Sequence, residues 1–289
     1  MIMPATAELP ADDFAYLCRL MHERAAIVLE PGKEYLALSR LDPIARHAGV
    51  RSVAELVDVL RGEDVASPLH EQVVDALTTN ETTFFRDHSP FESLRTHVLP
   101  ELIEQRRRSR TLAVWSAGCS SGQEPYSIAM AIREYFPELL TWQLSILGTD
   151  ISPSVLDRAR RGRYGQLEVN RGLPAHLLVR HFTRVGMEWE IEEPIRRMVR
   201  FERHNLVQDW PTLPPFDLVF MRNVMIYFDR DAKRDVLAKM RRQLSPFGYL
   251  LLGASETTYN LSEDFDRELD GRTAWYRPTR TDPVGGVGR

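Results

Sequence analysis

The chain has 289 residues, of which 43% are apolar, and it carries a formal net charge of −4. This length suits one large domain or two modest ones, with a sizeable core. The negative balance argues against bulk attraction to nucleic acid or to an anionic membrane. No run of about 18 apolar residues occurs, and residues 1–10 lack the basic and apolar regions of a secretory leader. We therefore expect a cytoplasmic protein that neither binds nucleic acid nor inserts into a membrane.

The chain contains two cysteines, Cys18 and Cys119. Two cysteines cannot build a disulfide framework, and neither stands in a metal-ligand spacing such as C-x-x-C. We expect both to be reduced thiols, and we expect no metal centre.

Residues 10–79 show helical periodicity and almost no strand signal. Leu17 and Met21 fall on one helical face, and Ser52 begins a pattern typical of a helix start. Pairs such as Pro-Gly and Asp-Pro divide the segment into short elements, as a small helical bundle requires. The sequence predicts an all-α N-terminal domain over residues 1–88.

A polar run with two aromatic residues follows this helical segment. Phe84 and Phe85 are expected to enter the core, where aromatic side chains are most often found. For Asn80, Thr82 and Arg86, the pattern alone assigns no role.

Residues 112–130 have the pattern of a strand, a tight turn and a helix. A short apolar run leads into small residues that end at Gly122, and Pro125 suits the first turn of a helix. The N-terminus of such a helix offers unpaired N–H groups to the polar end of a nucleotide-like ligand. Only Gly118 and Gly122 remain of the dinucleotide glycine fingerprint, so an ordinary strand-to-helix turn stays an alternative. No Walker sequence follows, which argues against NTP hydrolysis.

The second half of the chain alternates as an open, doubly wound α/β sheet does. Asp150 ends the second apolar strand, 28 residues beyond Gly122, in a position where carboxylates hold ribose hydroxyls. A helix N-cap is the alternative role for this residue. Further strands are predicted at residues 199–206, 216–223, 248–253 and, antiparallel to the rest, 273–277.

The interval between Asp150 and Asn205 is too long for one crossover helix. Residues 187–191 and 195–199 alternate as strands do. We predict a small antiparallel β insert at about residues 165–200 within a Rossmann-like domain that covers residues 89–289.

Five sequence blocks together resemble the chemotaxis receptor methyltransferase family, called CheR, over nearly the whole chain. The blocks are Asn80-x-Thr82-x-x-x-Arg86, Trp115–Ala129, Gly148–Asp150, Asn205-Leu206 and Arg222–Phe228. The resemblance implies that S-adenosylmethionine (SAM) is the cofactor and S-adenosylhomocysteine its product. It also implies glutamate γ-methyl esters formed on the cytoplasmic methylation helices of chemoreceptors. The positions that match the family's cofactor site are Asn80, Thr82, Arg86, Glu124, Asp150, Asn205, Leu206, Arg222 and Asn223.

The residue types suit this chemistry. A glutamate acceptor, with a pKa of about 4.3, is already ionised at pH 7, so no general base is needed. Asp150 is expected to bind the ribose, Asn205 and Leu206 the adenine, and Arg86 the cofactor's carboxylate. Tyr227 is the candidate catalytic residue, as a hydrogen-bond donor to the acceptor carboxylate, with a plain core tyrosine as the alternative.

Other functions remain as alternatives. They are a noncatalytic SAM-binding regulator and a methyltransferase acting on another protein carboxylate. A nucleic-acid amino-methyltransferase would show Asn/Asp-Pro-Pro-Tyr/Phe where this chain has Arg222-Asn-Val-Met, and a nicotinamide dehydrogenase would need a fuller glycine fingerprint.

Receptor tethering is a separate expectation. Family members that bind a receptor's C-terminal pentapeptide carry G-x-G-x-x-x-G in the insert, whereas the corresponding turn here has one glycine, Gly186. We expect an enzyme, monomeric in solution, that does not depend on the pentapeptide.

Overall fold

The computed structural model describes residues 9–279. Residues 1–8, which belong to the N-terminal segment compared above with a secretory leader, lie outside the described residues. The described chain forms two compact units. The first contains the chain up to Thr79 with Tyr227–Asp229, and the second contains Asn80–Ile226 and the chain from Arg230 onward.

This division falls earlier than the expected domain boundary at residue 88. The reason is the burial of Phe84, whose ring packs edge-on against Tyr164 and Phe182 in the core of the second unit. The backbone N–H of Phe85 also donates to Ser127 Oγ at 2.9 Å. The polar run at residues 80–88 therefore belongs with the sheet unit, and both phenylalanines are core residues as predicted.

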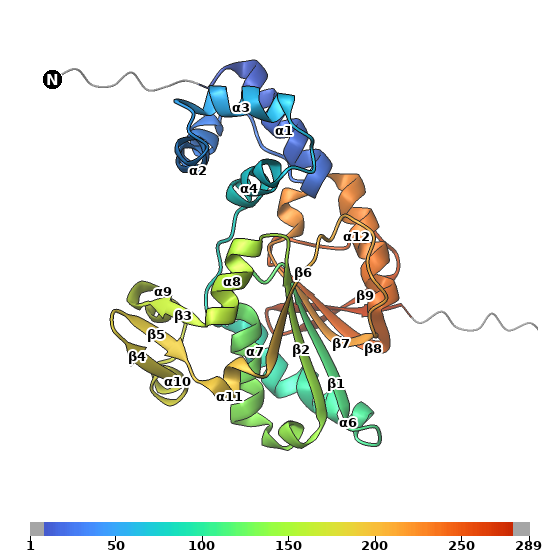
Figure 1. The fold of residues 1–289 in the computed structure, drawn as a ribbon. Coiled ribbons are helices and arrows are strands. Elements are labelled where there is room, and N and C mark those ends of the chain that lie inside the picture. Colours follow the sequence, from blue (N-terminus) through green and yellow to red (C-terminus); the bar gives the residue numbers. More distant parts are fainter. Residues whose placement is uncertain (1–8, 280–289) are drawn as a thin grey trace, which may run out of the picture. The chain divides into compact units, whose positions relative to one another are not determined.

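The first unit is all-α, as predicted (Figure 1). Its helices are α1 (Ala11–Ala25), α2 (Glu34–His47), α3 (Val53–Gly62) and α4 (Pro68–Leu77). Leu17, Leu41 and Leu56 are fully buried in its core. Ser52 caps α3, because its Oγ accepts the N–H of Glu55 at 3.1 Å.

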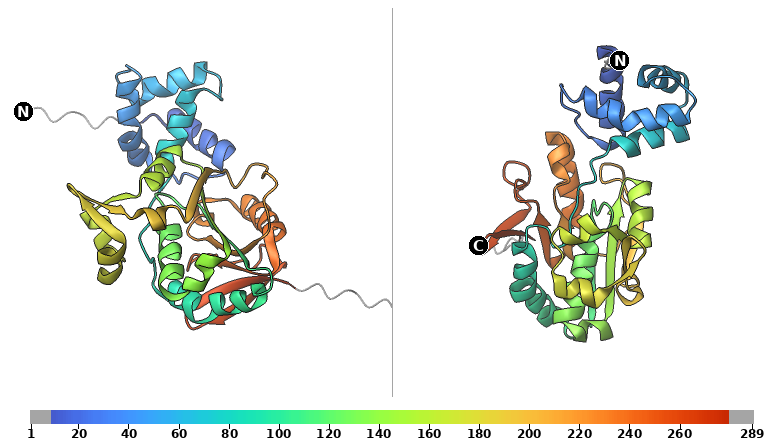
Figure 2. Two further views of the ribbon diagram at one scale, coloured as in Figure 1. Left: turned by 60° about the horizontal axis from the view of Figure 1, so that its bottom comes forward. Right: turned by 90° about the vertical axis from the view of Figure 1, so that its left-hand side faces the viewer.

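The second unit is built on a seven-stranded sheet in the order β6-β2-β1-β7-β8-β10-β9 (Figures 1 and 2). The strands are β1 (Thr111–Ala117), β2 (Gln143–Asp150), β6 (Val199–Arg203), β7 (Phe216–Met221), β8 (Leu244–Leu252), β9 (Phe265–Asp270) and β10 (Thr273–Pro278). The first five are parallel, and β10 is antiparallel to both of its neighbours. The chain departs from β1 toward β2 on one side and returns at β7 on the other, which places the topological switch point beside β1. The doubly wound prediction is confirmed.

Helices cover both faces of this sheet (Figure 1). They are α5 (Ser89–Ser93), the π-helical η1 (Leu94–Val98), α6 (Leu99–Arg106), α7 (Gln123–Tyr135), α8 (Pro153–Arg161) and α12 (Arg230–Gln243), with the short 3-10 turns η2 (Pro137–Thr141) and η3 (Met225–Tyr227). Every residue of β7 is buried, as expected for a parallel strand covered on both faces.

The insert lies between β2 and β6 in the chain and projects to one side of the sheet (Figures 1 and 2). Its elements are β3 (Arg163–Gly165), α9 (Gln166–Asn170), α10 (Ala175–His181), β4 (Phe182–Val185), β5 (Glu188–Ile191) and α11 (Glu193–Arg196). The three strands form an antiparallel sheet in the order β3-β5-β4. The strand predicted at 195–199 is wrong, because Pro194 suits the first turn of the helix α11 and the strand β6 begins only at Val199.

Candidate cofactor site

The carboxyl ends of the parallel strands and the loops that follow them form what we call the cofactor edge. The turn after β1 depends on two glycines. Gly118 has φ +73°, and a Cβ on it would lie 2.4 Å from Val224 Cγ2. Gly122 has φ +92°, and a Cβ there would lie 2.9 Å from Ala159 Cβ. Side chains at either position would be strained and would clash, so the small residues keep this turn tight.

Asp150 is held at the end of β2 by backbone donors. Its Oδ2 accepts the N–H of Ser120 at 2.8 Å, and its Oδ1 accepts the N–H of Ser152 at 3.0 Å. Ser120 Oγ donates to the carbonyl of Asn80 at 2.8 Å, which brings Asn80 and Asp150 together. The N-cap of α8 is Ser152, not Asp150. The Asp150 carboxylate is therefore oriented by backbone N–H groups of the turn after β1 and of the start of α8, as a ligand-binding group would be.

An ion-pair network centred on the buried Arg222 joins three segments at the cofactor edge. The guanidinium of Arg222 is 1% exposed and contacts Glu124 at 3.3 Å and Asp87 at 2.5 Å. Its Nη2 also donates to the carbonyl of Arg86 at 3.1 Å. Arg222 Nε has no partner among residues 9–279. The network fixes the loop after β7 against α7 and against the polar run at 80–88.

Glu124 lies at the first turn of α7, where its charge is favoured by the helix N-terminus. Ser116 Oγ donates to its Oε1 at 2.8 Å. Burial raises the pKa of the Glu124 carboxyl, against the opposing effects of Arg222, Ser116 and Arg86. Both carboxylate oxygens are thus occupied by the protein itself.

Glu256 holds the loop that carries Asn223. Its Oε1 accepts the N–H groups of Val224 and Ile226, and its Oε2 accepts those of Asn223 and Gly253, at 2.6 to 3.1 Å. Asn223 itself has φ +59°, a left-handed conformation that asparagine tolerates. Its Oδ1 is buried without a hydrogen-bond partner in the described chain, which suits an acceptor facing a ligand.

Asn205 and Leu206 follow β6, next to the end of β2. The N–H of His204 donates to the Asp150 carbonyl at 2.9 Å, so the loop starts beside the ribose candidate. Lys239 Nζ donates to the carbonyls of Leu206, Val207 and Gln208 at 2.8 to 3.4 Å. One ammonium group thus fixes the backbone of this loop, and Leu206 is buried.

Two further candidates lie on the run at 80–88. Arg86 donates to the carbonyl of Glu81 at 3.2 Å, and its charge acts on Glu124. Thr82 makes no hydrogen bond to any residue that the structure describes. The run brings Asn80 and Arg86 to the edge through printed contacts, whereas Thr82 is placed only by its neighbours in sequence.

Tyr227 does not belong to the unit that carries the other candidates. It groups with the helical unit, where its carbonyl accepts the N–H of Val28 at 2.9 Å. The adjacent Phe228 forms an antiparallel bridge with Ile27. The role assigned to Tyr227 therefore stays a prediction.

Sequence reasoning missed three residues that shape the site: Asp87, Lys239 and Glu256. Asp87 adjoins the family block that ends at Arg86. Lys239 and Glu256 bind backbone groups far from them in sequence, and no spacing rule predicts such contacts. The sequence signal for Glu256 was a carboxylate three residues beyond the end of the predicted strand 248–253.

The cysteine of the edge, Cys119, is not an activated nucleophile. Burial, with the nearby charges of Asp150 and Glu124, raises the pKa of the Cys119 thiol well above its usual value. No group of three metal-ligating side chains occurs within residues 9–279. No helix in the same range is long and apolar enough to cross a bilayer. What the edge offers is fixed polar groups for binding and orientation.

An open α/β sheet with a glycine turn and a carboxylate at its switch point defines a nucleotide-cofactor-binding protein of the doubly wound class. Comparison with known families identifies the family within this class. The model described as CheR methyltransferase, SAM binding domain, matches residues 80–271, and that of the CheR all-alpha domain matches residues 12–78. The chain belongs to the CheR methyltransferase family, is a SAM-dependent methyltransferase, and uses SAM as its cofactor.

Known chemotaxis protein methyltransferases are similar to this chain over most of its length. Chemotaxis protein methyltransferase 1 of Pseudomonas aeruginosa is 43% identical over 258 residues, covering 88% of this chain and 93% of the relative. Chemotaxis protein methyltransferase Cher2 of Pseudomonas putida is 41% identical, with 88% and 93% covered. Chemotaxis protein methyltransferase 1 of Vibrio cholerae is 40% identical, with 88% and 92% covered.

The residues present fit this cofactor. Asp150 is an oriented carboxylate, and the buried Asn223 Oδ1 and Arg222 Nε are an acceptor and a donor without partners in the described part of the chain. The turn at Gly118 packs against Val224 and leaves no room for a side chain, which keeps the small-residue turn close to the end of β1.

Proposed function

We propose that the protein methylates glutamate side chains of chemoreceptors, forming γ-methyl esters, and so adapts chemotaxis signalling. The names of its relatives support the chemotaxis assignment. The observation that carries the chemistry is an edge of oriented, charge-paired residues whose cysteine, Cys119, is a buried thiol with a raised pKa. Such a site suits an acceptor that is already a nucleophile.

Bound SAM supplies an electrophilic methyl group on a sulfonium. The acceptor glutamate is ionised at pH 7, so the protein has to orient it in line with the methyl carbon and to exclude water. Asp150 would hold the ribose, Asn205 and Leu206 the adenine, and Arg86 the carboxylate of the methionine part. Asn80, Thr82, Glu124, Arg222 and Asn223 complete the proposed binding set.

The test is transfer of a radiolabelled methyl group from SAM to a purified chemoreceptor. Incorporation that is released as methanol by mild base identifies a carboxyl ester, and peptide mapping identifies glutamate. Labelling of a different protein carboxylate, with none on any receptor, would support the first alternative. SAM binding without transfer to any protein would support the noncatalytic regulator.

For Tyr227 we propose a hydrogen bond from the phenol to the acceptor carboxylate. The variant Tyr227→Phe should bind SAM with unchanged affinity and lose methyl transfer, because the contact acts after the cofactor is bound. Calorimetry and turnover together check this. Equal turnover in the two proteins would leave Tyr227 a core residue.

We also propose that receptor recognition does not require a C-terminal pentapeptide. The hairpin of β4 and β5 turns at Gly186 and Met187, the only positions between the two strands. Gly186 has φ +62°, as the first central residue of a type II′ turn needs, and a single glycine suffices for that. The turn therefore has a tight two-residue form.

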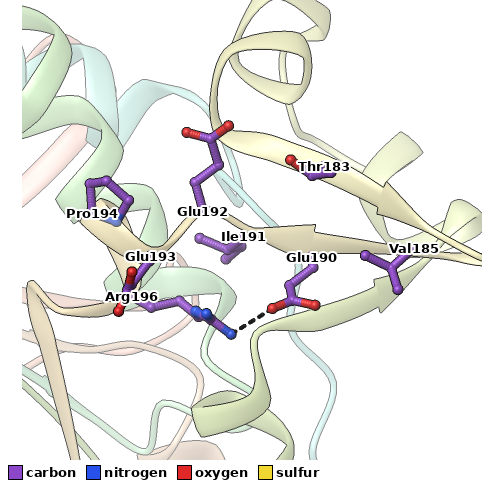
Figure 3. Close-up of a pocket in the computed structure, with 8 residues that line it drawn as sticks. All are labelled: Thr183, Val185, Glu190, Ile191, Glu192, Glu193, Pro194 and Arg196. Atoms are coloured by element: carbon purple, nitrogen blue, oxygen red, sulfur yellow. Dashed lines mark hydrogen bonds and ion pairs between the residues drawn. The ribbon is translucent and has the colours of Figure 1, made fainter.

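The hollow beside this hairpin supports the same proposal. It encloses about 390 Å³, and Glu190, Glu192 and Glu193 line it with one cation, Arg196 (Figure 3). Arg196 is paired with Glu190 at 2.8 Å. Glu193 is paired with Arg197, so the exposed Glu192 is the carboxylate that would repel a peptide of aromatic and acidic residues.

A titration of aromatic-acidic pentapeptides against the protein tests this. We expect no saturable binding. A Kd in the low micromolar range, about −8 kcal/mol, would contradict the proposal. The proposal also includes a cytoplasmic monomer, which light scattering of the purified protein and cell fractionation would check.

A further inference from the structure

A groove of about 600 Å³ lies outside the cofactor site on the second unit. It is lined by Arg230 and Arg234 of α12, the loop 257–263, and Phe265 and Arg267 of β9. Arg230 and Arg234 are one helical turn apart, so both point to the same side of α12. We call this feature the arginine groove.

The arginines of the groove have few carboxylate partners. The side chain of Arg267 forms no hydrogen bond or ion pair with any residue of the described range 9–279. Arg230 donates to a backbone carbonyl, that of Asn260, at 3.3 Å. Arg234 lies 4.0 Å from Asp231, whose side chain is 93% exposed. All three arginines are exposed, and protein carboxylates compensate little of their positive charge.

The neighbouring acids are directed elsewhere. Along β9, successive side chains alternate between faces, so Asp266 and Glu268 lie on the face opposite to Phe265 and Arg267. Glu268 pairs with Arg277 at 3.6 Å on that other face. Glu263 is the single carboxylate of the lining. The groove is therefore positive in a chain whose formal net charge is −4.

The groove adjoins the reacting edge. Its loop begins at Thr257, directly after Glu256, whose carboxylate fixes Asn223, Val224 and Ile226. Tyr259 on the same loop is 76% exposed, and an exposed aromatic residue beside arginines is typical of protein interfaces.

We propose that the arginine groove docks the acidic receptor segment that carries the acceptor glutamates. This inference rests on the proposed function. A segment with several glutamates is anionic, and its carboxylates complement three exposed arginines whose carboxylate neighbours are Asp231, 4.0 Å from Arg234, and Glu263 of the lining. Residues next to the acceptor bind the groove, while the acceptor itself lies at the cofactor edge.

The experiment compares steady-state methylation of one chemoreceptor cytoplasmic fragment by the wild type and by the double variant Arg234→Glu with Arg267→Glu. We expect KM for the receptor to rise about tenfold or more, with kcat at saturating receptor changed less than about twofold. SAM affinity by calorimetry should be unchanged. The double variant Arg234→Lys with Arg267→Lys keeps the charges and should stay close to the wild type.

The matched control is Arg107→Glu with Arg108→Glu at the end of α6, two exposed arginines whose replacement changes the net charge equally. Its KM should not change. Wild-type transfer with equal KM in the groove and control variants would overturn the groove, as would a loss of SAM affinity in the groove variant. Absence of transfer by the wild type to any receptor would instead contradict the proposed function.

Discussion

The cofactor edge and the arginine groove belong to the same unit and use arginine in opposite ways. At the edge, Arg222 is buried and has two carboxylates and a carbonyl around it. In the groove, Arg234 and Arg267 are exposed, and Arg234 has only a distant contact of 4.0 Å with the exposed Asp231. A buried charge has to be neutralised within the fold and therefore fixes geometry, whereas an exposed charge remains available to a partner.

The largest effect on stability is expected for the variant Arg222→Met. It leaves Glu124 buried without its cation, so we expect a loss of about 4 kcal/mol in the free energy of unfolding. Urea denaturation measures this. The double variant Arg222→Met with Glu124→Gln should recover part of the loss, because it removes the uncompensated charge. Arg107→Met, which breaks an exposed pair with Glu104, should cost less than about 1 kcal/mol.

A second change tests whether a buried carboxylate can position a loop. In Glu256→Gln one carboxylate oxygen becomes an NH2 group that faces two backbone N–H donors. We expect a loss of about 2 kcal/mol in stability. The loop that carries Asn223 should also shift, so methyl transfer should fall. Glu263→Gln on the same loop, an exposed side chain, is the matched control and should change neither property.

The third prediction concerns the cofactor itself. Asp150→Ala should weaken SAM binding about tenfold, roughly 1.4 kcal/mol, because the ribose would lose its acceptor. Calorimetry on the folded variant checks this, with Asp157→Ala on α8 as the control for a lost surface acid. Unchanged affinity in a folded Asp150→Ala protein would remove Asp150 from the proposed site.

A region can be predicted from the sequence when its structure is determined by residues that are neighbours in the chain. The central strands were predictable because runs of apolar residues, such as residues 218–221 in β7, are buried on both faces. The edge strand β9 was not predicted, because only Phe265 within it is buried and its remaining residues, apart from the exposed Leu269, are charged. Pro194 marked a helix start where alternation alone suggested a strand.

The candidate site divides in the same way. Asp150 and Asn223 lie at strand ends, and the resemblance to a known family located them. Glu256, Lys239 and the arginine groove depend on contacts between segments far apart in sequence. Such contacts are set by the three-dimensional fold, so no short pattern contains them.

The smallest expected effect is a pH dependence that originates at His204, next to the loop of Asn205 and Leu206. His204 packs edge-on against Trp115 and Trp210, and its Nε2 is buried without a partner in the described chain. Burial lowers the pKa of His204, and the nearby ammonium of Lys239 lowers it further. The unfolded chain therefore binds a proton at higher pH than the folded chain does.

It follows that the folded state loses stability as the pH falls below about 6.5, the ordinary pKa of histidine. His204→Phe keeps an aromatic ring in the cluster and removes the titration, so its free energy of unfolding should fall less between pH 7 and pH 5. Lowering of the pKa of His181, also by burial, contributes a slope of the same sign, and the raised pKa of Glu124 contributes the opposite sign. Both groups are present in the two proteins, so the difference between the profiles isolates His204. Parallel profiles from denaturation at each pH would show that His204 titrates alike in the folded and unfolded chain.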